Sequence, residues 1–147
     1  MLFSPAFPAG GRRTGRPEPG RTGGYPAWVS ISLYYSAHRG SALSASERQA
    51  VAALIDADDD RDVVAGGSEP FCVYPYDSLD DGVVFEGSTK LPPDIQLAWE
   101  ATAHWSGLVS AIRRVIPDAA WHFSLDDHDF VWDGARQEYD PAAENAQ

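Results

Sequence analysis

The stretch WVSISLYYSAHRGSALSASERQAVAALID, residues 28–56, determines the fold class because a strand pattern is followed directly by a helix pattern. From residue 29 to residue 35 every second residue is apolar or aromatic, and the residues between them are serine or tyrosine. This period of two is typical of a strand with one buried face. The sequence therefore predicts a strand at 29–36 and a turn at 38–41.

The second half of the stretch has the signature of a helix. Ser44 and Glu47 have the spacing of a capping box, in which a serine hydroxyl and a glutamate carboxylate bind opposite free amides. Apolar residues then recur every three to four positions, so we expect a helix over 45–57. The acidic residues at 56–60 lie at the negative end of the helix dipole, where we expect them to unwind the chain into a polar loop.

Two further strands are expected in the middle of the chain. Residues 71–76 are aromatic and β-branched, and Pro75 among them favours a strand at the edge of a sheet. Asp81 and Gly82 form a strong hairpin signal. The returning strand is then expected at 83–88.

A longer helix and a fourth strand follow. The helix is expected to open at the prolines and acid of 92–94 and to stop at Pro117. Its apolar stripe includes Trp99 and Trp105, which we place in the core. Residues 121–125 alternate again between apolar and polar, which predicts a strand.

The predicted order is β-α-β-β-α-β, the ferredoxin-like signature. In this α+β two-layer sandwich, two helices cover one face of a four-stranded antiparallel sheet. Another two-layer α+β sandwich with the same elements connected differently is the alternative. We expect one domain at 27–133 and a polar C-terminal tail at 134–147.

The N-terminal segment 1–26 is rich in proline, glycine and arginine and has no hydrophobic periodicity. Such a composition predicts a disordered arm. One hypothesis is a tether for an acidic surface. The hypothesis we prefer is translated upstream sequence, with the true start near Val29, in a bacterium with a GC-rich genome.

The charge of the chain is unevenly distributed. The net charge is −11, although residues 1–25 contain four arginines and one glutamate. The remainder is therefore strongly acidic, which disfavours nucleic acid and favours a basic protein partner. The sequence also has no glycine-rich phosphate-binding motif and no RNA-binding aromatic strand.

The chain contains one cysteine, Cys72, so an intrachain disulfide is excluded and a reducing compartment is favoured. No apolar run approaches the roughly 18 to 20 residues that span a bilayer. The first residues place apolar groups before the arginines and interrupt them with prolines, unlike a secretory signal. We therefore predict a cytoplasmic protein with no membrane contact.

The predicted fold leaves one sheet face uncovered, and candidate catalytic residues fall on it. Glu86 and His122 share this face with Tyr34, and together they could form a general acid–base site. The alternative is that these groups only satisfy each other on a solvent-facing or dimer-facing sheet. A register error of one residue would reverse the assignment of faces.

Three other features suggest ligand chemistry less specifically. The cluster 126–129 has metal-type donors, but adjacent residues seldom point at one ion and no EF-hand spacing is present. Glu100 and His104 share a helix face as a solvated pair. Cys72 has no neighbouring base. We therefore assign no metal and no cofactor.

The leading hypothesis is an acidic protein-binding module that engages a basic partner, or a second copy of itself, through the open sheet face. A specific version is an immunity- or antitoxin-like inhibitor of a basic nuclease. The alternative is a small cofactor-independent enzyme with the acid–base site described above. The aromatic residues expected to anchor a partner are Tyr74, Tyr76, Trp28 and Trp132.

Overall fold

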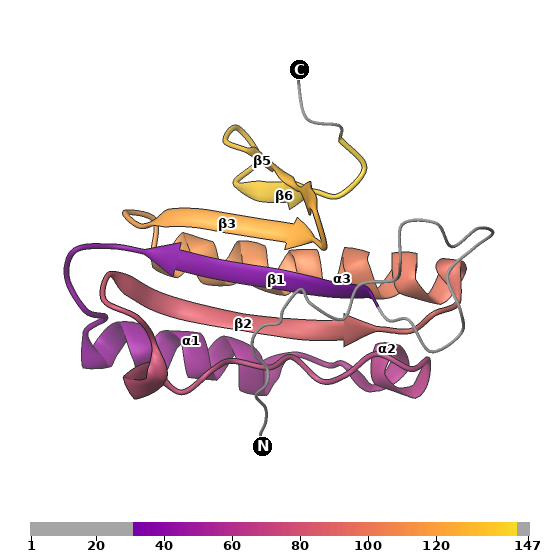
Figure 1. The fold of residues 1–147 in the computed structure, drawn as a ribbon, viewed down its shortest axis with the longest axis horizontal. Coiled ribbons are helices and arrows are strands. Elements are labelled where there is room, and N and C mark those ends of the chain that lie inside the picture. Colours follow the sequence, from indigo (N-terminus) through magenta and orange to yellow (C-terminus); the bar gives the residue numbers. More distant parts are fainter. Residues whose placement is uncertain (1–30, 144–147) are drawn as a thin grey trace, which may run out of the picture.

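The computed structural model describes residues 31–143, a mixed α+β fold with a four-stranded antiparallel sheet and three α-helices (Figure 1). The arm predicted at 1–26, Trp28 and the final residues 144–147 lie outside the described residues. The elements in chain order are β1 (Ile31–His38), α1 (Ala45–Ala57), α2 (Arg61–Ala65), the 3-10 helix η1 (Tyr76–Ser78), β2 (Val83–Leu91), α3 (Ile95–Val115), β3 (Ala120–Leu125), β4 (His128–Asp129), β5 (Val131–Asp133) and β6 (Glu138–Asp140).

The main sheet is built around β1, with the strand order β2-β1-β3-β4. Both β2 and β3 run antiparallel to β1, so they are parallel to each other. The helix that connects them, α3, passes behind β1 (Figure 1). A smaller antiparallel pair, β5 and β6, lies beyond β3.

The N-terminal caps of the two long helices form as the sequence predicts, whereas the polar loop expected after α1 contains the short helix α2. The Ser44 hydroxyl accepts a hydrogen bond of 3.0 Å from the Glu47 amide, and the Glu47 carboxylate accepts one of 2.8 Å from the Ser44 amide. The Asp94 carboxylate caps α3 by accepting from the Leu97 amide at 3.0 Å. These helices and the strands predicted after residue 80 are confirmed as α1, α3, β2 and β3.

The strand predicted at 71–76 is not formed, and the ferredoxin-like order is not confirmed. Only Val73 makes a β-bridge, to Gly87 of β2. The carbonyl oxygen of Cys72 accepts a hydrogen bond of 2.7 Å from the Tyr35 hydroxyl. The Cys72 carbonyl therefore points at the Tyr35 side chain, whose hydroxyl also lies 2.8 Å from the Thr89 hydroxyl. The fourth strand of the sheet is instead β4, at the opposite edge.

The core lies between the sheet and the helices and is rich in aromatic rings. Tyr35 stacks on Phe71 with ring centroids 4.4 Å apart, and Phe71 contacts Trp105 of α3 at 5.5 Å. Phe85 and Phe123 from the flanking strands complete the cluster around Tyr35. Tyr35, Phe85, Trp105 and Phe123 are fully buried, so these rings join three strands to α3.

The prediction that Trp99 lies in the core is wrong, because 49% of this residue is exposed. The buried side of α3 is centred on Ala98, Ala101, Trp105 and Ile112. Trp99 is rotated about 100° from Ala98 around the helix axis, since an α-helix has 3.6 residues per turn. The side chain therefore points away from the sheet.

A hairpin of β5 and β6 packs against the C-terminal half of α3. The Tyr139 amide donates a hydrogen bond of 2.8 Å to the Ser110 hydroxyl, and Arg113 donates one of 2.9 Å to the Tyr139 hydroxyl. Tyr139 is buried against Phe123 of the core. The turn and second strand of this hairpin fall within the segment that the sequence analysis assigns to the tail.

Candidate functional site

The sheet surface opposite the core carries mostly polar residues. Leu33, Tyr35 and Ala37 are buried in β1, so the residues between them point to the other side. The register with β1 assigns residues of β2 and β3 to the same two sides. We call this surface the polar sheet face, and its members are Ser32, Tyr34, Ser36, His38, Glu86, Ser88, Lys90, His122 and Ser124.

The strand register arranges these residues in rows. Ser36 lies opposite Glu86 on one side and opposite His122 on the other. Neighbouring strands are about 4.8 Å apart, so Glu86 and His122 are separated by about 10 Å with Ser36 between them. His122 bonds Asp129 instead of Glu86, and a small molecule could bridge Glu86 and His122. Tyr34 lies in the next row of the same face.

His122 is paired with Asp129 of β4. The His122 Nε2 atom lies 2.7 Å from Asp129 Oδ1, and both side chains are more than half exposed. Asp126 attaches the turn between β3 and β4 to β1, because its Oδ1 accepts a hydrogen bond from the Ser32 amide at 3.2 Å. Its own amide donates to the Ser32 carbonyl at 2.9 Å. Among residues 31–143 no group of three or more His, Cys, Asp or Glu could hold a metal ion.

Glu86 lies in a less polar environment than an exposed carboxylate. Burial raises the pKa of the Glu86 carboxyl, the charge of Asp80 raises it further, and His38 acts in the opposite direction. Tyr74 approaches the same region, with its hydroxyl 2.7 Å from the Ser88 hydroxyl. Burial also raises the pKa of Tyr74. Tyr74 thus extends the polar sheet face beyond β2.

Two other predicted anchors are covered by arginine side chains. The Arg48 guanidinium lies 4.3 Å from the centre of the Tyr76 ring, and that of Arg113 lies 4.1 Å from the Trp132 ring. Both aromatic residues are half-buried. Neither presents an uncovered ring to a partner, and the structure does not bring them together with Tyr34.

The remaining candidates have structural partners. His104 Nε2 lies 2.7 Å from Asp58 Oδ2, a contact that joins α3 to the end of α1. Glu100 instead accepts a hydrogen bond of 3.1 Å from Gln96. Cys72 is half-buried, and burial raises the pKa of its thiol. This shift disfavours the reactive thiolate.

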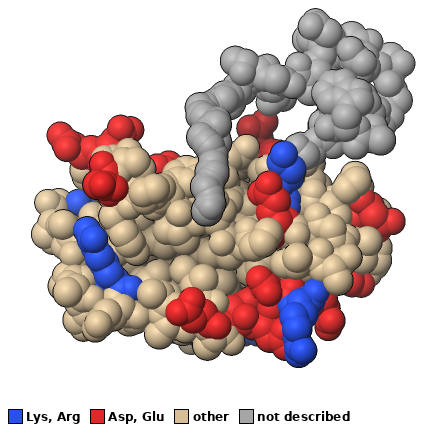
Figure 2. Space-filling model, turned by 90° about the horizontal axis from the view of Figure 1, so that it is seen from below, with Lys and Arg blue, Asp and Glu red and all other residues tan. Residues whose placement is uncertain are grey.

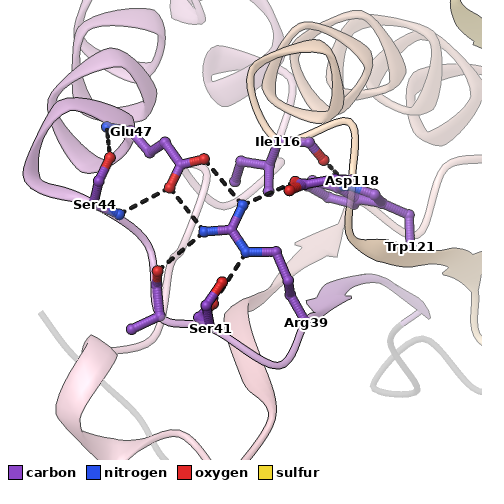
Figure 3. A network of polar contacts seen from close by, with 8 residues as sticks. Arg39, Ser41, Ser44, Glu47, Ile116, Asp118 and Trp121 are labelled. Carbon is purple, nitrogen blue, oxygen red and sulfur yellow. Dashed lines mark hydrogen bonds and ion pairs between the residues drawn. The ribbon is translucent and has the colours of Figure 1, made fainter.

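Arg39 forms a polar network that the sequence analysis missed (Figure 3). Its guanidinium donates to the carbonyls of Ser41 and Ala42, each at 3.0 Å. It also donates twice to Glu47, at 2.8 and 3.0 Å, and once to Asp118, at 2.8 Å. The network joins the end of β1, the start of α1 and the turn before β3. An arginine shortly before a capping box was the available signal, but the distant Asp118 could not be inferred.

A half-open pocket of about 190 Å³ lies beside this network, between the start of α1 and the loop before β2. Its lining combines the cationic side chains of Arg39 and Arg48 with the carboxylates of Asp80 and Asp81. None of its lining residues belongs to the polar sheet face. The pocket therefore does not enclose the predicted acid–base residues.

Comparison with protein families, with curated proteins and with solved structures gives no match to this chain. Within residues 31–143, no helix is both long enough and apolar enough to cross a membrane. Any functional assignment therefore rests on the chemistry of the polar sheet face and on the charge of the chain.

Proposed function

We propose that this protein is a binding module that engages a basic protein through the polar sheet face. The observation that supports this function is Tyr34, which is 44% exposed at the centre of a sheet face bordered by carboxylates. Tyrosine combines a large apolar ring with a hydroxyl and is common in protein interfaces. Glu86 lies on one side of Tyr34, and acidic residues of the β3–β4 turn lie on the other.

The overall charge supports the same class of partner. The chain carries −11, and Figure 2 shows carboxylates in several groups over one side of the molecule. A negative surface of this kind accelerates encounter with a positively charged protein and rejects acidic ones. In the more specific version of the proposal, the chain is an immunity- or antitoxin-like inhibitor that covers a basic nuclease.

The test is affinity capture with the tagged full chain and three variants. Tyr34→Ala and Glu86→Gln should each reduce recovery of a stoichiometric basic partner by at least tenfold. Asp56→Asn on α1 is the charge-matched control for Glu86→Gln and should leave recovery unchanged. The partner should also dissociate as salt is raised. Equal recovery with all variants would contradict the assignment of the binding surface.

A small cofactor-independent enzyme is the second candidate, with Glu86, His122 and Tyr34 in the site. Burial raises the pKa of Glu86, as expected for a general acid, and His122 is oriented by Asp129. The substrate would have to span the row across Ser36. His122→Ala should then abolish turnover while leaving partner capture intact. Loss of capture with unchanged turnover would favour the binding module.

We also propose that the fold is a ferredoxin-like variant whose second strand is reduced to a single bridge. The Val73–Gly87 bridge is antiparallel and places the irregular segment beside the outer edge of β2. The Tyr74 amide donates to the Glu86 carbonyl at 2.8 Å along the same edge. The single cysteine remains the basis for proposing a cytoplasmic location.

A further inference from the structure

The outward side of α3 carries apolar surface that no element within residues 31–143 covers. Ile95 is 86% exposed, and Trp99 is half exposed although it is the largest side-chain type. Further along this side, Ala103, Gly107 and Arg114 are exposed. Steps of four and seven residues keep Trp99, Ala103, Gly107 and Arg114 on one side of α3, and Ile95 lies at the edge of that side. The large Trp99 near the start of the helix is thus followed by the small residues Ala103 and Gly107.

We propose that this side of α3 binds a second copy of the chain. The two helices are antiparallel, and the twofold axis passes their exposed sides at the level of position 105. In an antiparallel pair, residues at equal distances from the axis face each other. Ala103 then faces Gly107 of the second copy, and Trp99 faces Ala111 of the second copy. A twofold axis repeats each contact, so the surface is self-complementary.

Side-chain size supports this partner over an unrelated one. Two small residues meet at the crossing point, which allows the helix backbones to approach closely. A Cβ atom added at Gly107 would meet nothing within 4 Å, so the surface is open at this point. Away from the crossing, the bulky Trp99 meets the small, half-buried Ala111. Large and small residues therefore alternate between the two copies.

The charges on α3 are complementary in the same orientation. Glu100 is exposed in the N-terminal half, and Arg114, which also donates a hydrogen bond of 2.6 Å to the Gln137 carbonyl, is exposed in the last turn. Antiparallel packing places Arg114 within about one helical turn of Gln96 and Glu100 of the second copy. Antiparallel helix dipoles also attract each other. A parallel pair would instead bring like charges together.

The test is the molar mass of the full chain in solution, measured by sedimentation velocity over a range of concentrations. The wild type should form a dimer in the micromolar range, because one helix pair is a small interface. Gly107→Leu should remain monomeric at every concentration. This substitution fits the monomer, since the position is open and leucine favours a helix more than glycine. Gly40→Leu is the matched control, also at an open position, and should still dimerise.

Exchanging the charges of Glu100 and Arg114 provides a second test of the dimer. Glu100→Arg should weaken the dimer at least tenfold, and adding Arg114→Glu should restore it. A wild type that is monomeric throughout, or a Gly107→Leu variant that dimerises normally, would overturn the proposal. Tyr34→Ala should leave the dimer intact. Loss of the dimer in that variant would place the interface on the polar sheet face and contradict the assignment to α3. Binding of a basic partner is tested separately, by the affinity capture described above.

Discussion

At Gly87 the main chain of Cys72 crosses β2 so closely that an added Cβ atom would lie 2.0 Å from the Cys72 carbonyl oxygen. The same Cβ atom would lie 2.5 Å from Cε1 of the Tyr35 ring. Tyr35 is fully buried and its hydroxyl holds Cys72 in place. Because Gly87 has no side chain, the Cys72 carbonyl has the space to reach the Tyr35 hydroxyl.

We expect Gly87→Ala to lower the free energy of unfolding by about 3 kcal/mol or more, because the backbone of Cys72 cannot yield without losing the Tyr35 contacts. Urea denaturation measures this change. Gly107→Ala is the matched control and should raise the stability by up to about 1 kcal/mol, since that position is open and helical. A normal unfolding midpoint for Gly87→Ala would show that the close crossing is absent.

The Arg39 network makes stability depend on pH. Hydrogen bonds from Arg39 lower the pKa of Glu47 from its ordinary value of 4.5 to about 2. Ionised Glu47 therefore stabilises the fold above pH 4.5, and this contribution is lost as the pH falls towards about 2. Wild type should be more stable than Glu47→Gln at pH 7, and the difference should shrink between pH 4.5 and 2. Chemical denaturation across this range tests the prediction, which a constant difference would contradict.

At the scale of the element, α3 separates two tryptophans by only six positions but places them in opposite environments. Trp105 is fully buried, and its indole N–H donates a hydrogen bond of 3.0 Å to the Ser68 hydroxyl. Trp99 lies on the exposed side of the same helix. The period of the helix decides the difference, because a residue one position from the buried arc already points outward.

We expect Trp105→Ala to destabilise the monomer by about 3 to 5 kcal/mol, through the cavity it leaves and the loss of aromatic contacts. Trp99→Ala should change monomer stability by about 0.5 kcal/mol or less, as is usual for exposed sites. Thermal unfolding at low protein concentration separates the two effects. Similar losses in both variants would mean that Trp99 is buried in the monomer.

At the scale of the whole molecule, self-repulsion opposes the compact state because the net charge is −11. Raising the ionic strength from about 0.01 to about 0.15 M shortens the screening length from about 30 to about 8 Å. We therefore expect added sodium chloride to raise the melting temperature of the full chain. A fall over this range would show that attractive pairs, such as those of Arg39, outweigh the repulsion.

Local patterns were sufficient to predict most regular elements and one property of the candidate site. The alternation in β1, the Ser44–Glu47 capping box and the proline that ends α3 act over a few residues, so they can be read from sequence. Alternation also placed Tyr34, Glu86 and His122 on one sheet face. It did not show that Ser36 separates the last two, because that distance depends on which strands are neighbours.

The sequence by itself determined the type of each long element and the side of the sheet on which its residues lie, because 2.0 and 3.6 residue periods are local properties of the backbone. Tertiary structure alone decided that the Cys72 carbonyl bonds Tyr35, which acids surround Arg39, and that Trp99 is exposed. These outcomes depend on contacts between residues far apart in the chain. The Tyr35 hydroxyl bonds both Thr89 and the main chain of Cys72, and the Cys72 contact joins residues 37 positions apart, so the local pattern of 71–76 could not reveal it.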